Sequence, residues 1–400
     1  MGKPLKRYGF WAAVLMTAWC VSTCKKQIPT QEITGVKNYL IVNGNINTND
    51  TTLINLSRLV SVTDSSHGKP ELNATLTIEG QQSGSYPLSE TGKGNYFAPA
   101  LNLSSSQNYR LHIKTSDGKE YASDYVPVKN SPAIDTIDYT INATGVNINA
   151  NTHDANNQTH YYRWDYTETY IIHEPYYSHY KTVNHDTILL RAPEEQVYEC
   201  WVTDTSSTIV LGTSINLSQD VIAKQVVATM PSSSEKLHVK YSILVKQYAL
   251  TADAYNYLTL LKKNTEQLGS IFDAQPSALT GNIHCLSDNE PVIGYITAGQ
   301  VAQKRIFIDN SAFPVSWTAS LPYGSCELDT LLYARYVPPR IPLPGLNGTT
   351  SFEVHDELYT GIKDPIDKIG EYPTGGFTGS FPVCVDCTVR GTNKKPSFWK

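Results

Sequence analysis

The sequence is poor in charged residues. Lys and Arg number 32 and Asp and Glu 37, so charged residues make up 17 % of the 400 residues, against roughly 25 % in an ordinary soluble domain. The formal net charge is −5 and no basic block occurs, which argues against a nucleic-acid binder. Aromatic residues still reach 10 %, whereas disordered chains have few of them. We therefore expect a folded protein that does not bind nucleic acid.

Phenylalanine is scarce, and tyrosine takes its place. The chain has 9 Phe and 26 Tyr, and a tyrosine ring carries a hydroxyl that suits half-wet surfaces and binding faces. Residues 160–180 (HYYRWDYTETYIIHEPYYSHY) hold seven of these tyrosines. We expect Tyr176–Tyr180 to lie in a loop, and the alternative is a Tyr-rich hairpin packed on its own sheet. The candidates for contact with a ligand are Tyr170, Tyr176, Tyr177 and Tyr180.

Long hydrophobic runs are also rare. The apolar run Phe10–Val21 follows three basic residues near the N-terminus, and it is shorter than the roughly 20 residues that cross a bilayer. This pattern predicts an export signal over residues 1–23. The next string, Val21-Ser22-Thr23-Cys24, resembles a bacterial lipobox. We expect Cys24 to be acylated and residues 24–35 to tether the protein to a lipid bilayer; an ordinary secretory signal is the alternative.

Cysteines are few, and export would let them form disulfides. The candidates are Cys200, Cys285, Cys326, Cys384 and Cys387, which allow two bridges with one cysteine left over. The sequence does not choose among the arrangements, and the link we favour joins Cys326 to Cys384 or Cys387. A redox or zinc role for the close pair is disfavoured, because it opens no thioredoxin-like helix and no second close pair exists. The spacing of His173, His179 and His185 does not match that of metal-ligating histidines, so we expect no metal or other cofactor.

Alternation of apolar and polar residues predicts a mainly β protein. Short alternating segments over residues 36–130 favour an immunoglobulin-like sandwich. A second β-rich domain, also a sandwich, is expected over 131–340, with strands at Ile134–Ile141, Tyr161–Ile172 and Leu237–Val245.

One helix is predicted inside the second domain, over residues 251–268. Thr251 is a good N-cap, and the expected buried stripe is Ala254, Leu258, Leu261 and Leu268. Residues 341–400 are rich in Pro and Gly, and we expect them to be irregular and pinned by cysteine bridges.

Catalytic motifs are missing from the sequence. It contains no GxSxG elbow, phosphate-binding loop, HExxH motif or calcium-binding loop, each of which needs a fixed residue spacing. Asp288, Glu290 and Asp309 were considered for glycoside cleavage, which needs two carboxyl groups about 5–10 Å apart in a cleft. Solvated loop acids are the favoured interpretation. We expect a protein that is not an enzyme.

Several strings carry a resemblance to a known family. They are NYLIVNGNI, LHIKTSDGKEYASDYVPV, SPAIDTI, ECWVTDTSSTIVLGTS, LTGNIHCLSDNEPVIGYITAGQVAQKRIFI and CVDCTVRGTNKKPSFW. In this order they resemble domain-of-unknown-function family 4249, outer-membrane lipoproteins of Bacteroidota. The resemblance implies a lipid-anchored protein of the outer membrane that acts beside a SusC-like TonB-dependent receptor. It brings no catalytic residues with it.

Two functions follow from the resemblance and the motifs together. The first is an accessory or ligand-capture partner of a TonB-dependent nutrient transporter. The alternative is a cell-surface adhesion or assembly module that binds protein or glycan. Lys25 and Lys26 follow Cys24, where acidic residues often mark export to the outer leaflet, so the sequence leaves the surface and periplasmic faces both open.

Overall fold

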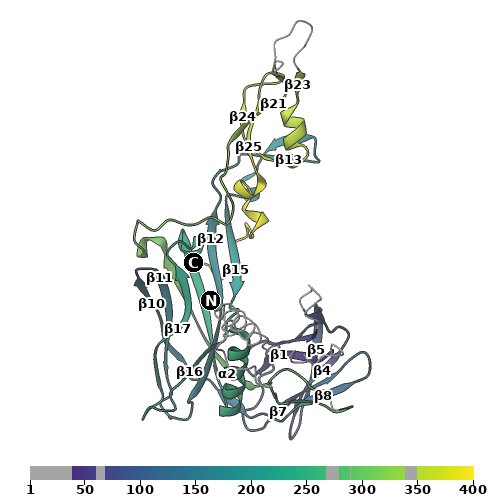
Figure 1. Ribbon diagram of the computed structural model, residues 1–400, viewed down its shortest axis with the longest axis vertical. Helices are drawn as coiled ribbons and strands as arrows, with labels where there is room; N and C mark the ends of the chain where they lie inside the picture. Colours follow the sequence, from purple (N-terminus) through teal and green to yellow (C-terminus); the bar gives the residue numbers. More distant parts are fainter. Residues whose placement is uncertain (1–37, 60–67, 267–278, 289, 338–348) are drawn as a thin grey trace, which may run out of the picture.

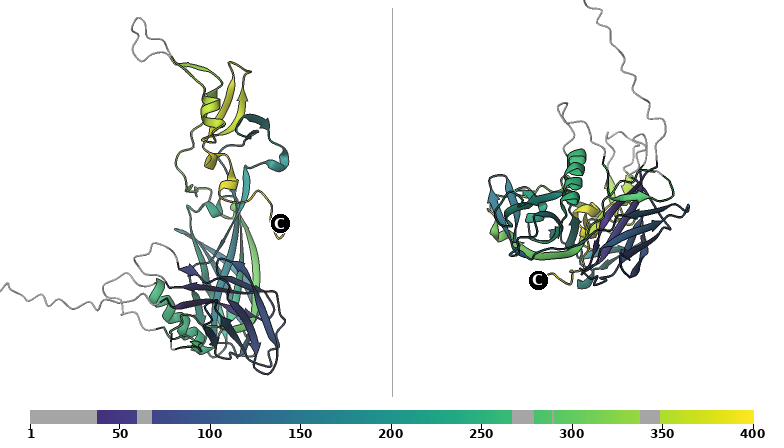
Figure 2. Two further views of the ribbon diagram at one scale, coloured as in Figure 1. Left: turned by 90° about the vertical axis from the view of Figure 1, so that its right-hand side faces the viewer. Right: turned by 90° about the horizontal axis from the view of Figure 1, so that it is seen from below.

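The chain forms a body of two β-sandwiches with a long arm that stands out from one of them (Figures 1 and 2). The structure is a computed structural model that describes residues 38–59, 68–266, 279–288, 290–337 and 349–400. Twelve strands from the two sandwiches join edge to edge in a single path, in the order β15-β12-β18-β20-β1-β2-β6-β5-β4-β7-β8-β19. The predicted class, mainly β with two sandwich regions and one inserted helix, is confirmed.

The first sandwich is built from short strands with one buried face. Alternating residues of these strands, such as Leu76 and Ile78, are fully buried in one core, as a period of two predicts for a sheet covered on one side. Its strands are β1 (Leu40–Asn47), β2 (Thr52–Arg58), β3 (Lys69–Pro70), β4 (Thr75–Gly80), β5 (Ser85–Gly92), β6 (Asn95–Ala98), β7 (Tyr109–Lys114) and β8 (Glu120–Ser123).

A later part of the chain, residues 279–288 and 290–298, completes this first sandwich, and we name it the return segment. Strand β19 (Ile283–Cys285) pairs with β8, and the backbone N–H of Val42 donates to the carbonyl of Ile293 at 2.8 Å. Ile283 and Ile296 are buried in the first core. The expected second domain, 131–340, includes this segment, because local alternation does not show which sheet a strand joins.

The second sandwich packs a three-stranded sheet against the longer strands that lead to the arm. Trp164, Tyr241 and Ile243 are buried between the two layers. The strands are β10 (Ile134–Asn142), β11 (Gly145–His153) and β17 (Val221–Pro231) on one side, and β12 (Tyr161–His173), β15 (Glu199–Thr205), β16 (Val210–Thr213), β18 (Lys240–Ala249) and β20 (Ala298–Asp309) on the other, with β9 (Val128–Asn130) beside β20.

Helix α2 (Ala252–Glu266) lies beside the two sandwiches (Figure 1). Its N-cap is Thr251, whose side-chain oxygen accepts a hydrogen bond from the backbone N–H of Ala254 at 3.2 Å. The buried residues are Ala254 and Tyr257, whereas Leu258 and Leu261 are only partly buried. The predicted stripe is therefore wrong in part.

Aromatic contacts explain the rotation of the helix. The ring of Tyr257 packs on Tyr295 at 5.2 Å between centroids, and Tyr255 packs on Tyr161 at 5.0 Å. Aromatic pairs bury large areas in preferred geometries. The helix therefore turns its tyrosine face toward the sandwiches, and Leu258 and Leu261 are buried less than expected. Leu268, which was expected on the stripe, lies outside the described residues.

The arm comprises residues 174–198 and the described residues between 319 and 391, and Figure 1 shows it above the second sandwich. Its final part contains strands although the Pro- and Gly-rich sequence gave no alternation to predict them. A sheet in the order β21-β25-β24 lies beside the hairpin β13-β14. The strands of the arm are β13 (Tyr180–Val183), β14 (Thr187–Leu190), β21 (Asp329–Leu332), β22 (Arg335–Val337), β23 (Thr349–Ser351), β24 (Asp364–Ile369) and β25 (Gly376–Ser380).

Two disulfides fix the arm. Cys326 is joined to Cys384 within the arm, and Cys387 is joined to Cys200 on β15. The expectation of disulfides is confirmed. Cys285, also a candidate, is a free thiol, because the return segment places it in the first sandwich while the other four cysteines lie in the arm and at its base.

A buried ionic cluster, which we name the joint, lies where the arm leaves the body. Arg390 donates to Glu174 at 2.8 Å and to Glu235 at 2.8 Å, and the hydroxyl of Tyr323 donates to the other oxygen of Glu174 at 2.8 Å. The side chain of Glu174 is 0 % exposed. A carboxylate in such surroundings is stable only while these partners remain, so the joint holds the arm at a defined position on the body.

Candidate functional site

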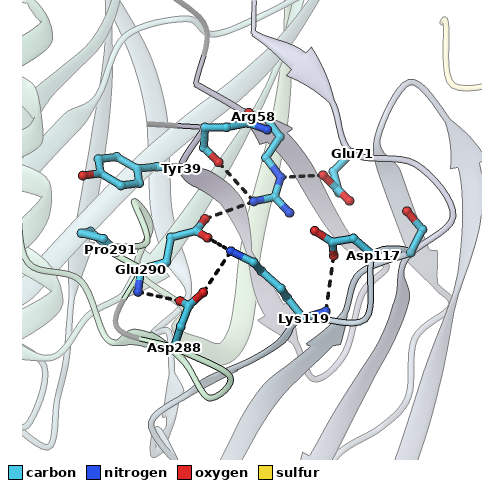
Figure 3. A pocket seen from close by; sticks show the side chains of 10 residues that line it. Tyr39, Arg58, Glu71, Asp117, Lys119, Asp288, Glu290 and Pro291 are labelled. Atoms are coloured by element: carbon cyan, nitrogen blue, oxygen red, sulfur yellow. Dashed lines mark hydrogen bonds and ion pairs between the residues drawn. The ribbon is translucent and has the colours of Figure 1, made fainter. Parts of the chain in front are cut away.

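A charged hollow of about 610 Å³ lies at one edge of the first sandwich, and we name it the ionic pocket. Its lining residues come from five parts of the chain, and Figure 3 shows their side chains gathered around the hollow. Arg58 ends β2, Lys119 precedes β8, and Asp288, Glu290 and Pro291 belong to the return segment. The lining residues are Asn38, Tyr39, Arg58, Glu71, Ser116, Asp117, Lys119, Asp288, Glu290 and Pro291.

Arg58 is the central cation of the ionic pocket. Its Nε donates to Glu71 at 2.6 Å and its Nη1 donates to Glu290 at 3.2 Å. Nη1 also lies 3.3 Å from the hydroxyl of Tyr121. The arginine side chain is 7 % exposed. Burial alone would lower the pKa of Arg58, but its bonds to Glu71 and Tyr121 raise it, so the guanidinium is permanently charged.

Lys119 ties the return segment to the sandwich. Its Nζ pairs with Glu290, and it lies 3.1 Å from the carboxylate of Asp288. The hydrogen bonds that Lys119 donates to Glu290 and Asp288 raise the pKa of Lys119. The backbone N–H of Glu290 donates to Asp288 at 2.8 Å and is the main cause of the lowered pKa of Asp288. Both groups are therefore ionised at neutral pH.

Asp117 forms the opposite wall of the ionic pocket. It lies in the turn between β7 and β8, where its carboxylate accepts hydrogen bonds from the hydroxyl of Thr115 and from the backbone N–H of Lys119. The bond from Thr115 is the first cause of the lowered pKa of Asp117. Asp117 is exposed, so its charge faces both the pocket and solvent.

Asp288, Glu290 and Asp309, the three acids named as candidates for glycoside cleavage, do not lie together in the structure. Asp288 and Glu290 line the ionic pocket, whereas Asp309 ends β20 in the second sandwich and lies 3.5 Å from Lys240. Glu290 was expected to be a solvated loop acid, but its side chain is 14 % exposed. That interpretation is wrong for Glu290, because two cations from distant strands hold it against the sandwich.

Sequence reasoning missed Arg58, Glu71 and Lys119 altogether. They are separated by 13 and 48 positions in the sequence, and no residue spacing marks them as neighbours. The one available signal was Asp117-Gly118, a pair typical of hairpin turns, which correctly places the β7–β8 turn between strands.

The tyrosine candidates have different surroundings. Tyr170 is buried in the core of the second sandwich, with its ring 5.4 Å from Nζ of Lys236, so it does not face solvent. Tyr176 donates its hydroxyl to the carbonyl of Cys326 at 2.8 Å, and the ring of Tyr180 packs on Phe377 at 5.3 Å. These two residues hold the arm together. The loop expected over Tyr176–Tyr180 is present up to residue 179, and Tyr180 begins β13.

Tyr177 is the candidate that reaches the surface. It is exposed and packs beside the rings of His179 and Tyr198. It shares the arm with other exposed apolar side chains, of which Leu190 is 69 % exposed. These exposed side chains, which we name the arm surface residues, are Tyr177, Leu189, Leu190, Phe352, Ile362 and Tyr372. Large apolar side chains exposed on a projecting element favour contact with another macromolecule.

A buried carboxyl group in the arm gives a prediction about pH. Burial, and then the charge of Asp386, raise the pKa of Asp364 to about 6, while Arg191 opposes them. Because the folded pKa lies above the unfolded value of 3.8, this group destabilises the fold increasingly as pH rises through both values. We expect Asp364→Asn to stabilise the protein by about 3 kcal/mol at pH 8 and about 1 kcal/mol at pH 4.5 in urea unfolding.

Asp367 provides the matched control for Asp364. It lies on the same strand, but it is exposed and pairs with His179 at 2.7 Å, so Asp367→Asn should change stability by less than about 0.5 kcal/mol at either pH. A gain for Asp364→Asn that is equal at pH 8 and pH 4.5 would show that ionisation of Asp364 is not its cause.

Cys24, the expected lipidation site, lies outside the described residues. None of the helices in the described part of the chain is long and apolar enough to cross a membrane. Among the residues that the structure describes, no group of three or more His, Cys, Asp or Glu side chains is placed to hold a metal ion.

Comparison with known proteins identifies the family. The model of the domain of unknown function DUF4249 matches residues 26–305, which include the first sandwich, the return segment and almost all of the second sandwich. The chain therefore belongs to this family. No curated protein matches it. The matched range ends before residues 319–391, so the later part of the arm lies outside it.

Proposed function

We propose that this chain is a lipid-anchored outer-membrane protein that captures a ligand for a SusC-like TonB-dependent receptor and is not itself an enzyme. The main support for this proposal comes from the arm. It projects from the body, two disulfides and the joint fix it, and it exposes the arm surface residues. A rigid element with apolar side chains loses little conformational entropy when it docks on a partner, which suits the contact with a receptor.

The ionic pocket supports binding over catalysis. A general acid or base must reach the reacting atom of its substrate, but the carboxylate of Glu290 is already held between Arg58 and Lys119. Glu71 is also paired with the guanidinium of Arg58. The pocket therefore suits recognition of a ligand by fixed charges.

Purification from outer membranes in a gentle detergent tests the receptor partnership. We expect the tagged wild-type protein to bring down a TonB-dependent receptor, and we expect Leu189→Asp with Leu190→Asp to reduce that receptor by roughly fivefold or more, because interface energy is concentrated in a few side chains. Ile215→Asp with Leu217→Asp is the control, since these residues are equally apolar and exposed on the second sandwich. Recovery of the wild-type protein without any receptor would contradict the proposal.

A further inference from the structure

A second hollow, which we name the groove, lies between the two sandwiches. It has a volume of about 480 Å³ and shares no lining residue with the ionic pocket. Strands β12 and β18 contribute Arg163, Asp165 and Tyr248, which alternate with residues of the second core and so face away from it. Strands β1 and β2 of the first sandwich contribute Asn43 and Leu53. The sheet that joins the sandwiches is therefore concave on its outer face, as sites for small ligands are.

Arg163 uses only part of its hydrogen-bonding capacity in the groove. Both of its hydrogen bonds to described residues come from Nη2, to Asp165 at 3.2 Å and to the amide oxygen of Asn45 at 3.4 Å. Its guanidinium lies over the ring of Tyr248 at 4.2 Å. Nε is buried without a hydrogen-bond partner among the described residues. A guanidinium has five N–H donors, so Arg163 can donate from Nη1 to an oxygen atom that the protein does not supply.

The charges in and beside the groove are already paired. Asp165 is bonded to Arg163 and accepts a hydrogen bond from the hydroxyl of Tyr248 at 3.4 Å. Lys246 lies 3.1 Å from the carboxylate of Asp50. An ionic ligand would leave a charge without a partner here, which is costly. A neutral oxygen atom can accept a hydrogen bond from Arg163 and leave both pairs intact.

Most of the remaining lining consists of neutral amides and hydroxyls. Among the hydrogen bonds of the described residues, none involves the side chains of Asn43, Thr167 or Thr205, and each of these groups can both donate and accept. An apolar surface lies beside them. Leu53 is 51 % exposed and Phe97, its cross-strand neighbour, is 36 % exposed. Hydroxyl groups at the edge of a sugar ring suit the amides, and its C–H face suits the apolar pair.

We propose that the groove binds a neutral carbohydrate. A sugar oxygen accepts a hydrogen bond from Nη1 of Arg163, further hydroxyls bond to Asn43 and Thr167, and one ring face packs on Leu53 and Phe97. The volume of about 480 Å³ is in the range of small-ligand sites. This site is separate from the arm and the ionic pocket, so the inference goes beyond the proposed function and does not depend on a receptor.

Calorimetric titration with neutral and charged sugars tests the inference. We expect at least one of maltotriose, cellotriose and mannotriose to bind with a Kd below about 1 mM. Trigalacturonate, which carries carboxylates, should bind at least about tenfold more weakly than that sugar, because the groove offers its charges no free cation. No heat from any of the three neutral sugars at about 10 mM, or equal or tighter binding of trigalacturonate, would overturn the proposal.

Substitutions locate the binding within the groove. Arg163→Met should weaken the sugar by about tenfold, because a hydrogen bond from a charged donor is lost. Asn43 is exposed, so Asn43→Ala should weaken the sugar by about fivefold without changing the unfolding midpoint. Arg110→Met is the matched control, since Arg110 also lies over a tyrosine ring and pairs with a carboxylate, but outside the groove. Full affinity in both groove variants would contradict the site.

The sugar and receptor experiments fail independently. If the receptor co-purifies but no neutral sugar binds, the assignment of the groove is wrong and the partnership stands. If a sugar binds in the groove but no receptor is recovered, the groove is assigned and the proposed partnership is wrong.

Discussion

Replacing both Cys200 and Cys387 with alanine is expected to lower the free energy of unfolding by about 3–5 kcal/mol. The bridge closes a loop of 187 residues between β15 and the end of the arm, and a long loop gains most entropy in the unfolded state when the link is lost. Both sulfur atoms belong to residues that are fully buried, so packing is lost as well. Urea unfolding under non-reducing conditions measures the change.

The free thiol of Cys285 is the control for this experiment. Cys285→Ala removes a sulfur atom without opening a loop, and we expect it to cost less than about 1 kcal/mol. If the double variant loses no more stability than Cys285→Ala, the bridge between β15 and the arm does not constrain the fold.

Arg390→Met is expected to destabilise the protein by about 3–5 kcal/mol, because it leaves the carboxylate of Glu174 buried without a cation. The side chain of Glu174 is 0 % exposed, and among the described residues the variant leaves it only the hydrogen bond from Tyr323. Adding Glu174→Gln to Arg390→Met should recover part of the loss, since an amide has no charge to desolvate. The midpoint of urea unfolding reports both effects.

An exposed pair in the first sandwich provides the comparison for Arg390. Arg110 lies 2.7 Å from Glu79, and each side chain is about one third exposed, so Arg110→Met should cost less than about 1 kcal/mol. A similar loss for Arg110→Met and Arg390→Met would mean that burial does not set the importance of the joint.

Elements whose signal is local could be predicted from the sequence. The strand predicted over Tyr161–Ile172 is observed as β12, which extends one residue further, to His173. Trp164 on this strand lies in the core. Thr251 caps the helix as its side chain suggested. In each case neighbouring residues of the chain decide the structure, through side-chain alternation or a capping hydrogen bond.

Elements that depend on distant partners could not be predicted. No sequence feature of the return segment indicates that it joins the first sandwich. Arg58 and Glu290, which form an ion pair, are 232 positions apart in the sequence. Tyr170 was a ligand candidate, but it lies on the same face of β12 as Trp164 and points into the core. In the arm, β24 and β25 form because strands from three segments pair there, while their Pro- and Gly-rich sequence favours turns.

The base of the arm has a mechanical consequence. The long strands β12 and β15 pair over seven residues, from Thr167↔Thr205 to His173↔Glu199, and the bridge at Cys200 lies near the arm end of that ladder. Because β12 enters the arm and β15 leaves it at the same end of this ladder, a pull along the arm draws both strands together, and the bond at Cys200 also links β15 to the end of the arm. The pairing of β12 with β18, from Tyr162↔Ala249 to Tyr170↔Tyr241, is then the one loaded in shear, where the hydrogen bonds resist together and do not open one after another. If a partner moves the arm, the second sandwich must move with it.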